Sequence, residues 1–406
     1  MRVDTMRRVD YWIGVPLCFL LSLFAGLLKI FRPRPISLIR RVLFVELSEM
    51  GSAILVDPAM RKLQREANAE LFFVIFERNK PSLQLLKTVS EDNIYTLRED
   101  NLWTLLVDTL GFLRWVRKRR VDAVIDLELF SRFTALLTGL SGVQQRVGFY
   151  AFHNEGLYRG NFLTHRVAYN PHIHIAKNFM ALVNALLSDK EQIPYFKGAI
   201  GDDEIVLQQT QVEARELEEL AVLISQATAL YRRGETPIVL INPNASEMLV
   251  QRRWPVGNYI LLVRRILHEY PEALVLITGA PGEHAEAENL RTAVGSQRCV
   301  NFAGVVRFAQ LPALYWLSAL MVTNDSGPAH FAAVTPLPTF VLFGPETPAL
   351  YGALGRATPI YAGLACSPCV SAANHRKTAC RNNMCLQAIT PDQVFNTIEP
   401  VLSASA

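Results

Sequence analysis

The segment with the clearest chemical pattern is NDSGPAHFAA, which runs from Asn324 to Ala333 directly after the apolar run Ala319–Asn324. Gly327 allows close backbone approach, and Pro328 suits the first turn of a helix. We therefore predict a strand, a turn and a helix whose free N–H groups bind an anion such as a diphosphate. His330 is a candidate hydrogen-bond donor to a phosphate or sugar. The alternative is an ordinary capped helix with a satisfied histidine.

A second polar loop, residues 242–255 (NPNASEMLVQRRWP), follows another apolar run. Asn244 and Ser246 supply polar groups, and Arg252 supplies a guanidinium group. An arginine at a strand end can neutralise the charge that develops on a departing nucleoside diphosphate. The alternative is a solvated pair of arginines, Arg252 and Arg253.

Two further loops follow the same pattern of strand, turn and helix. Residues 278–288 (TGAPGEHAEAE) place Glu283 where an acidic residue can bind ribose hydroxyls. The alternative is the acidic first turn of a surface helix. Residues 343–348 (FGPETP) are predicted to form a wall of the same site.

The elements that position these loops alternate between strands and helices, which predicts parallel sheets with right-handed crossovers. The apolar runs indicate two series of strands. The first series is Val42–Leu47, Ala69–Phe76, Asn93–Leu97 and Asp122–Leu129, and the second is Pro237–Pro243, Ala273–Gly279, Ala319–Asn324 and Thr339–Gly344.

Length and composition fit two domains and exclude one class of partner. The chain has 406 residues, half of them hydrophobic, with 41 basic and 37 acidic residues. That length accommodates two α/β cores, and we expect domains at residues 36–195 and 196–406. The balanced charge argues against a nucleic-acid-binding protein.

Residues 1–35 are expected to form a membrane anchor. An uncharged apolar run extends from Tyr11 to Leu28, at the lower limit of length for a spanning helix. More basic residues follow the run than precede it, which favours a cytoplasmic main body at the inner membrane. The alternatives are a cleaved signal peptide, a helix lying in the membrane plane because of Pro16, and a buried core helix.

Four cysteines cluster near the C-terminus: Cys366, Cys369, Cys380 and Cys385. A chain of this length and composition indicates a reducing compartment rather than a disulfide framework. The spacing also fits a structural zinc site, but we favour reduced or partly disulfide-linked thiols without a role in the mechanism.

Taken together, these motifs resemble glycosyltransferase family 9, which contains the lipopolysaccharide heptosyltransferases. The resemblance is clearest in Arg252 with Trp254-Pro255, in Gly279–Glu283 and in Asp325–His330, and is looser in Leu47–Gly51. It implies the GT-B fold of two Rossmann-like domains facing a cleft. It also implies inverting, metal-independent transfer of a sugar from a nucleoside-diphosphate donor, such as ADP-heptose, to a membrane-borne, lipopolysaccharide-type acceptor.

The resemblance also implies roles for single residues. Arg252 would assist the leaving diphosphate, Glu283 would face the ribose, and Arg132 would meet an anionic acceptor. The diphosphate and sugar would be held by Asp325, Ser326, Gly327 and His330.

One position departs from the family pattern. The family's S-x-x-G-D turn ends in an aspartate that serves as general base, whereas this chain has Ser52 there. A serine does not accept a proton at neutral pH, so another carboxylate must act. We favour Glu49 over Glu46 and Asp57. The departure keeps two other functions open: a non-catalytic scaffold or regulator, and a nucleotide-sugar epimerase.

Overall fold

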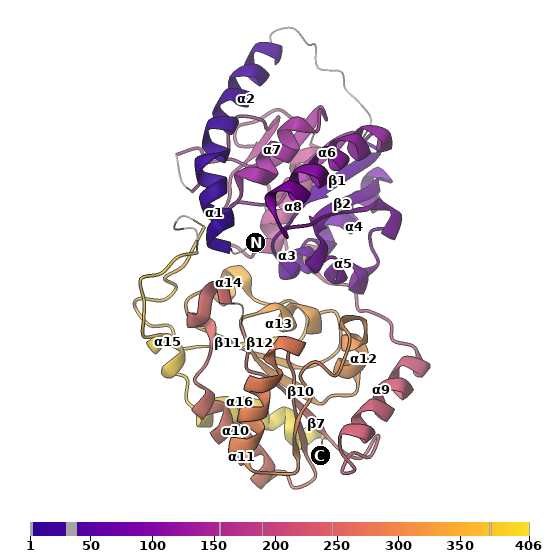
Figure 1. Cartoon of the computed structure of the whole chain (residues 1–406), viewed down its shortest axis with the longest axis vertical. Helices are drawn as coiled ribbons and strands as arrows, with labels where there is room; N and C mark the ends of the chain where they lie inside the picture. The colour runs from indigo at the N-terminus through magenta and orange to yellow at the C-terminus, as the bar shows by residue number, and fades with distance from the viewer. Residues whose placement is uncertain are drawn as a thin grey trace. The chain divides into compact units, whose positions relative to one another are not determined.

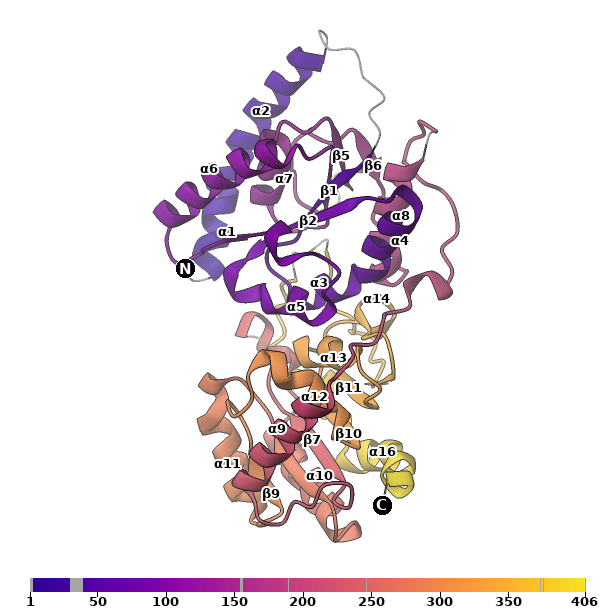
Figure 2. The ribbon, with the colours of Figure 1, turned by 90° about the vertical axis from the view of Figure 1, so that its right-hand side faces the viewer.

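The computed structural model describes residues 3–29, 39–153, 156–188, 190–245, 247–372, 374 and 376–405. It divides into two compact units (Figures 1 and 2). The N-terminal unit comprises Met1–Val206 with Ala372–His375, and the C-terminal unit comprises Leu207–Ser371 with Arg376–Ala406.

The N-terminal unit is built on a six-stranded parallel sheet with strand order β3-β2-β1-β4-β5-β6. Its strands are β1 (Arg41–Val45), β2 (Glu70–Phe76), β3 (Ile94–Leu97), β4 (Ala123–Asp126), β5 (Gln145–Phe149) and β6 (His165–Val167). Its helices are α1 (Val3–Trp12), α2 (Gly14–Lys29), α3 (Met50–Leu55), α4 (Asp57–Ala67), α5 (Pro81–Leu86), α6 (Leu102–Arg119), α7 (Arg132–Leu140) and α8 (Ile175–Leu187).

The C-terminal unit repeats this architecture, with strand order β12-β11-β10-β7-β8-β9. Its strands are β7 (Ile238–Asn242), β8 (Leu274–Ile277), β9 (Cys299–Asn301), β10 (Leu320–Asn324), β11 (Thr339–Phe343) and β12 (Ala357–Tyr361). Its helices are α9 (Ala214–Ala227), α10 (Val256–Glu269), α11 (His284–Val294), α12 (Leu311–Trp316), α13 (Gly327–Ala332), α14 (Pro348–Tyr351), α15 (Met384–Gln387) and α16 (Pro391–Ser405).

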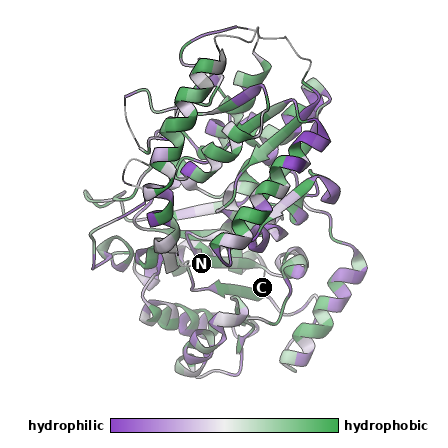
Figure 3. Ribbon diagram, turned by 45° about the horizontal axis from the view of Figure 1, so that its top comes forward, coloured by the Kyte–Doolittle hydropathy of each residue, from purple (hydrophilic) through white to green (hydrophobic). Residues whose placement is uncertain are grey.

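Both sheets confirm the predicted α/β class with parallel strands. In each unit the order of strands reverses direction between two central strands, β1 and β4 in the first and β7 and β10 in the second. The central strands are buried on both faces. Figure 3 shows hydrophobic strands in both units. Ligands of open α/β sheets bind beyond the carboxyl ends of strands at such a reversal, so the loops after these four strands are the natural site positions.

The predicted N-terminal anchor has a different form in the structure. The apolar run is divided between α1 and α2, which meet at Ile13. Helix α2 packs on α7, where a Cβ at Gly14 would lie only 2.9 Å from Cβ of Arg132 and where Cys18 is fully buried. No helix in the described part of the chain combines the length and apolarity needed to cross a membrane. Residues 30–38 of the expected anchor and its flank lie outside the described residues.

An ion pair fastens α1 to the sheet-covering helix α7. The carboxylate of Asp10 accepts hydrogen bonds from the backbone N–H groups of Arg132 (2.8 Å) and Phe133 (3.0 Å), and its other oxygen lies 3.0 Å from Arg132 Nη1. Both side chains are largely buried. Asp10 therefore binds the positive end of the α7 dipole as well as a buried guanidinium.

We expect Asp10→Ala to lower the free energy of unfolding by about 3 kcal/mol, because it leaves the guanidinium of Arg132 buried without its carboxylate. Urea denaturation of the full chain measures this loss. Asp392→Ala is the matched control, since Asp392 pairs with Arg265 at the surface and its removal should cost less than about 1 kcal/mol. Equal losses in the two variants would contradict the structural role of Asp10.

Candidate active site

The loops that follow β7 and β10 meet through Asn324. The Asn324 side chain accepts hydrogen bonds from the backbone N–H of Trp254 (3.0 Å) and from the Tyr259 hydroxyl (3.1 Å). It donates to the backbone oxygen of Pro243 at 2.7 Å. This fully buried amide thus holds the loop carrying Asn244 and Arg252 against the end of β10. The predicted motif began at Asn324, but its clamping role becomes visible only in the structure.

The structure brings Arg252 and Asp325 together, as the sequence pattern predicted. Arg252 Nη1 lies 3.8 Å from Asp325 Oδ2 and 3.8 Å from Glu346 Oε2. Arg376 Nε lies 3.2 Å from the other oxygen of Glu346. All four side chains are at least four-fifths buried. We call Arg252, Asp325, Glu346 and Arg376 the buried charge cluster.

The two carboxyl groups of this cluster interact, and the pKa of each is raised above its ordinary value. Burial, followed by the negative charge of Asp325, raises the pKa of Glu346 to about 8, while Arg252 opposes the shift. Burial also raises the pKa of Asp325, but Arg252 and the hydrogen bond from Glu346 lower it. At neutral pH the cluster therefore holds two guanidinium groups, one carboxylate and one neutral carboxyl group. Its net charge is +1.

Buried polar atoms without a hydrogen-bond partner lie in the cluster and on the loop that carries Arg252. Among the described residues, Asn244 Nδ2, Arg252 Nε and Asp325 Oδ2 are buried without a hydrogen-bond partner. Buried donors rarely remain unpaired, because losing water without a replacement bond costs about 1–3 kcal/mol per group. Two unpaired donors in a positively charged, buried setting suit an anionic ligand.

The remaining residues of the NDSG motif surround the start of α13. Ser326 takes the N-cap position, but its hydroxyl donates to the Asn324 backbone oxygen (3.2 Å) and does not cap the helix. Gly327 is the first residue of α13, and His330 lies one turn further on and is mostly buried. Ser246 lies outside the described residues.

Glu283 occupies the turn after β8. Its Oε2 accepts a hydrogen bond from the Ala280 backbone N–H at 2.6 Å and so closes the turn. A Cβ at Gly279 would lie 2.8 Å from this oxygen and 3.1 Å from Asn244 Nδ2, so glycine allows both side chains to converge there. Glu283 therefore lies beside Asn244, with one of its oxygens already used by the turn.

In the N-terminal unit, the turn after β1 is organised by buried carboxyl groups. Glu128, after β4, accepts a 2.7 Å hydrogen bond from the Ser48 hydroxyl. Glu46 accepts from the backbone N–H groups of Ser48 (3.3 Å) and Glu49 (3.2 Å). Burial, followed by the nearby charge of Glu128, raises the pKa of Glu46 well above its ordinary value. Glu46 is therefore a buried acid that shapes the turn.

The three carboxylates considered for the base role differ in accessibility. Asp57 is fully buried and paired with Arg61 at 2.7 Å, and Glu46 is buried with a raised pKa. Glu49 is partly exposed at the N-cap position of α3, where its Oε2 accepts a 3.1 Å hydrogen bond from Ser52. Only Glu49 of these three combines exposure with the place where the family pattern has its aspartate, one helical turn away at Ser52.

Arg132 lies elsewhere than we expected for an acceptor-binding residue. Its side chain is buried under α1, with Nη1 paired to Asp10 and Nε donating to the Tyr158 backbone oxygen at 2.9 Å. Arg159 is the arginine that reaches the strand ends, where it pairs with Asp126. Burial raises the pKa of Asp126 to about 6, although Arg159 lowers it. We therefore revise the role of Arg132 to a structural one.

Two other features lie outside this arrangement. The six cysteines are free thiols, and none of the described residues form a group of three or more side chains placed to hold a metal ion.

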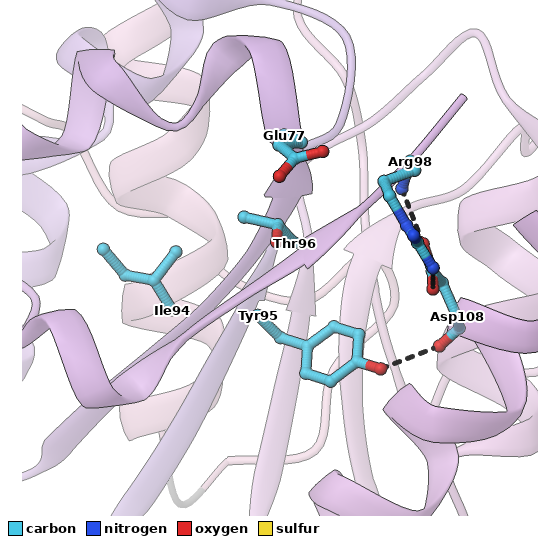
Figure 4. A pocket seen from close by; sticks show the side chains of 6 residues that line it. All are labelled: Glu77, Ile94, Tyr95, Thr96, Arg98 and Asp108. Atoms are coloured by element: carbon cyan, nitrogen blue, oxygen red, sulfur yellow. Dashed lines mark hydrogen bonds and ion pairs between the residues drawn. The ribbon is translucent and has the colours of Figure 1, made fainter. Parts of the chain in front are cut away.

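A pocket of about 430 Å³ opens between β3 and α6 (Figure 4). There Arg98 pairs with Asp108 at 2.7 Å, and the Tyr95 hydroxyl donates to the Asp108 backbone oxygen, so the lining residues join α6 to the sheet.

Comparisons with solved structures identify the architecture. The heptosyltransferase II of Escherichia coli aligns with a TM-score of 0.67 at 20% identity, covering 90% of this chain and 100% of that one. A family 9 glycosyltransferase from Veillonella parvula aligns with a TM-score of 0.69 at 16% identity, covering 91% and 99%.

Sequence comparisons point the same way. Lipooligosaccharide heptosyltransferase 2 of Haemophilus influenzae is 32% identical over 40% of this chain and 46% of its own length. Lipopolysaccharide heptosyltransferase 2 of Salmonella typhimurium is 30% identical over 28% of this chain and 33% of its own. The chain thus matches these curated relatives over less than half of their length. Residues 110–379 match the family model for glycosyltransferase family 9 (heptosyltransferase), and the chain belongs to that family.

Proposed function

We propose that this protein is an inverting, metal-independent glycosyltransferase of lipopolysaccharide biosynthesis. It moves a heptose-like sugar from a nucleoside-diphosphate donor to a glycolipid acceptor at the cytoplasmic face of the inner membrane. The observation that carries the proposal is the buried charge cluster with its unpaired donors, Asn244 Nδ2 and Arg252 Nε. Membership of family 9 and the names of the relatives support the reaction class.

The C-terminal unit would bind the donor. Arg252 faces two carboxyl groups that carry a single negative charge at neutral pH, which leaves the cluster attractive to a diphosphate. As the bond between the sugar carbon and the diphosphate oxygen breaks, both electrons stay with the leaving oxygen. Arg252 would stabilise that charge, and the buried setting strengthens the interaction. Ser326, Gly327 and His330 would surround the phosphates and sugar, and Glu283 would face the ribose with its remaining oxygen.

The N-terminal unit would supply the base. Glu49 would take the proton from the acceptor hydroxyl as that oxygen attacks the sugar carbon from the side opposite the leaving group, which inverts the configuration. Glu49 is the partly exposed carboxylate among the three candidates. The hydrogen bond from Ser52 keeps its carboxylate oriented.

A titration with nucleotides tests the donor site. The E. coli heptosyltransferase WaaC has been solved with ADP and with ADP-2-deoxy-2-fluoro heptose, so we expect ADP to bind better than UDP, GDP or CDP. At about 100 times its dissociation constant, ADP should stabilise the full chain by about 2.7 kcal/mol, which a thermal shift detects. Arg252→Ala should reduce the shift, because it removes the guanidinium proposed to face the diphosphate. No shift with any nucleotide would refute the donor site.

The same titration has an expected pH dependence. Glu346 loses its proton as the pH rises through about 8, which reduces the net charge of the cluster from +1 to zero. We therefore expect ADP affinity to fall about ten-fold between pH 7 and pH 9, and Glu346→Gln to remove that fall by keeping the group neutral. Calorimetry at both pH values measures it, and an unchanged pH dependence in Glu346→Gln would contradict the assignment.

One observation, the serine at position 52, favours a second function. A paralogue without the usual base would bind nucleotide but act as a scaffold or regulator. It would show the ADP shift without any transfer to a glycolipid acceptor, whereas the enzyme shows both.

A further inference from the structure

Helix α2 is apolar around most of its circumference but buries only one narrow stripe. Gly14 and Cys18 face α7, and Ser22 donates its hydroxyl hydrogen to the Cys18 backbone oxygen on the same side. The exposed side chains of α2 are large and apolar: Leu17, Phe19, Leu20, Leu23, Phe24 and Leu27. A helix that is hydrophobic all round belongs in an apolar environment. The contact with α7 covers only part of the apolar surface of α2.

Helix α6 carries a second exposed apolar stripe on the same face of the sheet. Both α6 and α1 pack on the hydrophobic cluster that lies under α7, and Figure 1 shows α2 and α6 on either side of α7. Five exposed apolar side chains cover the first half of α6: Leu102, Trp103, Leu106, Val107 and Leu110. The two stripes therefore belong to one layer of helices that covers one face of the sheet.

The α6 stripe changes from apolar to basic along the helix. Arg114 lies four positions after Leu110 on α6. Arg117 and Lys118 follow on the same side of the helix, and all three basic residues are exposed. Two tryptophans of these helices are also exposed. Trp12 is the last residue of α1 and is 73% exposed, and Trp103 lies in the first turn of α6 and is 72% exposed. Apolar side chains bordered by tryptophan and basic residues match the boundary between lipid headgroups and acyl chains.

We propose that α1, α2 and α6 form a membrane-docking face that lies in the plane of an anionic bilayer. In this arrangement α2 lies flat on the bilayer because Asp10 and α7 hold the helical pair against the domain. The apolar side chains of α2 and of the first half of α6 enter the acyl boundary. Arg114, Arg117 and Lys118 contact the headgroup phosphates. This face goes beyond the proposed transfer reaction and does not depend on it.

Co-sedimentation with vesicles tests this face on the full chain. Vesicles of phosphatidylethanolamine with 30% phosphatidylglycerol should bind the protein, and phosphatidylcholine vesicles should bind it at least about ten-fold more weakly. Leu20→Ser with Phe24→Ser should reduce binding about ten-fold or more. Arg117→Glu with Lys118→Glu should have a similar effect and should weaken the dependence on salt.

A matched control separates this face from general hydrophobic adsorption. Leu261→Ser alters an exposed leucine on α10 of the C-terminal unit, 55% exposed against 59% for Leu20, and should leave vesicle binding unchanged. Quenching of tryptophan fluorescence by brominated lipid should fall in Trp103→Phe. Thermal unfolding checks that each variant folds, since the replaced side chains lie on the surface.

Two outcomes would overturn the proposal. One is equal vesicle binding by the wild type and by folded α2 and α6 variants. The other is a stable oligomer of the wild type that the α2 variant dissociates without any change in vesicle binding, because a second copy of the chain would then cover the face.

Discussion

Arg252→Ala is expected to lower kcat/KM for sugar transfer by about 10²–10³, with kcat falling as much as kcat/KM. Removing a buried donor that stabilises charge on a leaving group has an effect of this size. The loss should exceed that of an ordinary ion pair, because Arg252 lies 3.8 Å from each of two buried carboxyl groups and has an unpaired Nε among the described residues. Steady-state kinetics with ADP-heptose and a glycolipid acceptor measures it.

Two further variants provide comparisons for Arg252→Ala. Arg252→Lys keeps the charge but loses the planar guanidinium, so its activity should lie between those of the wild type and Arg252→Ala. Arg265→Ala removes an arginine of the same unit whose partner, Asp392, is exposed, and it should change kcat/KM less than two-fold. A loss below five-fold in a folded Arg252→Ala protein would exclude Arg252 from leaving-group stabilisation.

Glu49→Gln is expected to lower kcat by about 10²–10⁴ while leaving ADP binding unchanged, because glutamine keeps the shape of the side chain but accepts no proton. Single-turnover kinetics separates this chemical step from donor binding. Glu46→Gln is the matched comparison. Glu46 is buried and its raised pKa favours the protonated form, so the amide should replace the acid with little change in rate.

The departure at Ser52 offers a rescue experiment. Ser52→Asp restores the carboxylate that the family pattern has at this position. Ser52 lies one helical turn from Glu49, and its hydroxyl donates a hydrogen bond to Glu49. In the Glu49→Gln background it should recover part of the lost rate. A wild-type rate in Glu49→Gln would mean that another group is the base. Absence of transfer in the wild type, with ADP binding intact, would favour the scaffold.

The central framework of this protein could be predicted from its sequence because each central strand is a run of residues that are apolar on both faces. The predicted strands at 42–47 and 319–324 correspond to β1 and β10. Strand β5 and the edge strands β6, β9 and β12 escaped prediction. They are short or mixed in polarity, and β12 exposes Thr358 and Pro359, so their identity depends on pairing with a neighbour and not on local hydrophobicity.

The same distinction applies to the candidate site. Local turn chemistry marked Arg252, Asp325 and the loop that contains Glu346, because polar residues after buried parallel strands collect at one edge of a sheet. Arg376 lies between Cys369 and Cys380 in the sequence, outside the predicted site loops. Its contact with Glu346, thirty positions earlier in the chain, arises from folding.

Two features were decided only by tertiary packing. The apolar N-terminal run satisfied the composition of an anchor, yet contacts through Gly14, Cys18 and Asp10 place it on α7. Arg132 matched a basic position after a strand, yet its direction is determined by Asp10, 122 positions away. The sequence by itself determined the strands, the turns and the types of group at their ends. The tertiary structure decided which of those groups are paired, buried or protonated, because burial and charge partners come from residues distant in the chain.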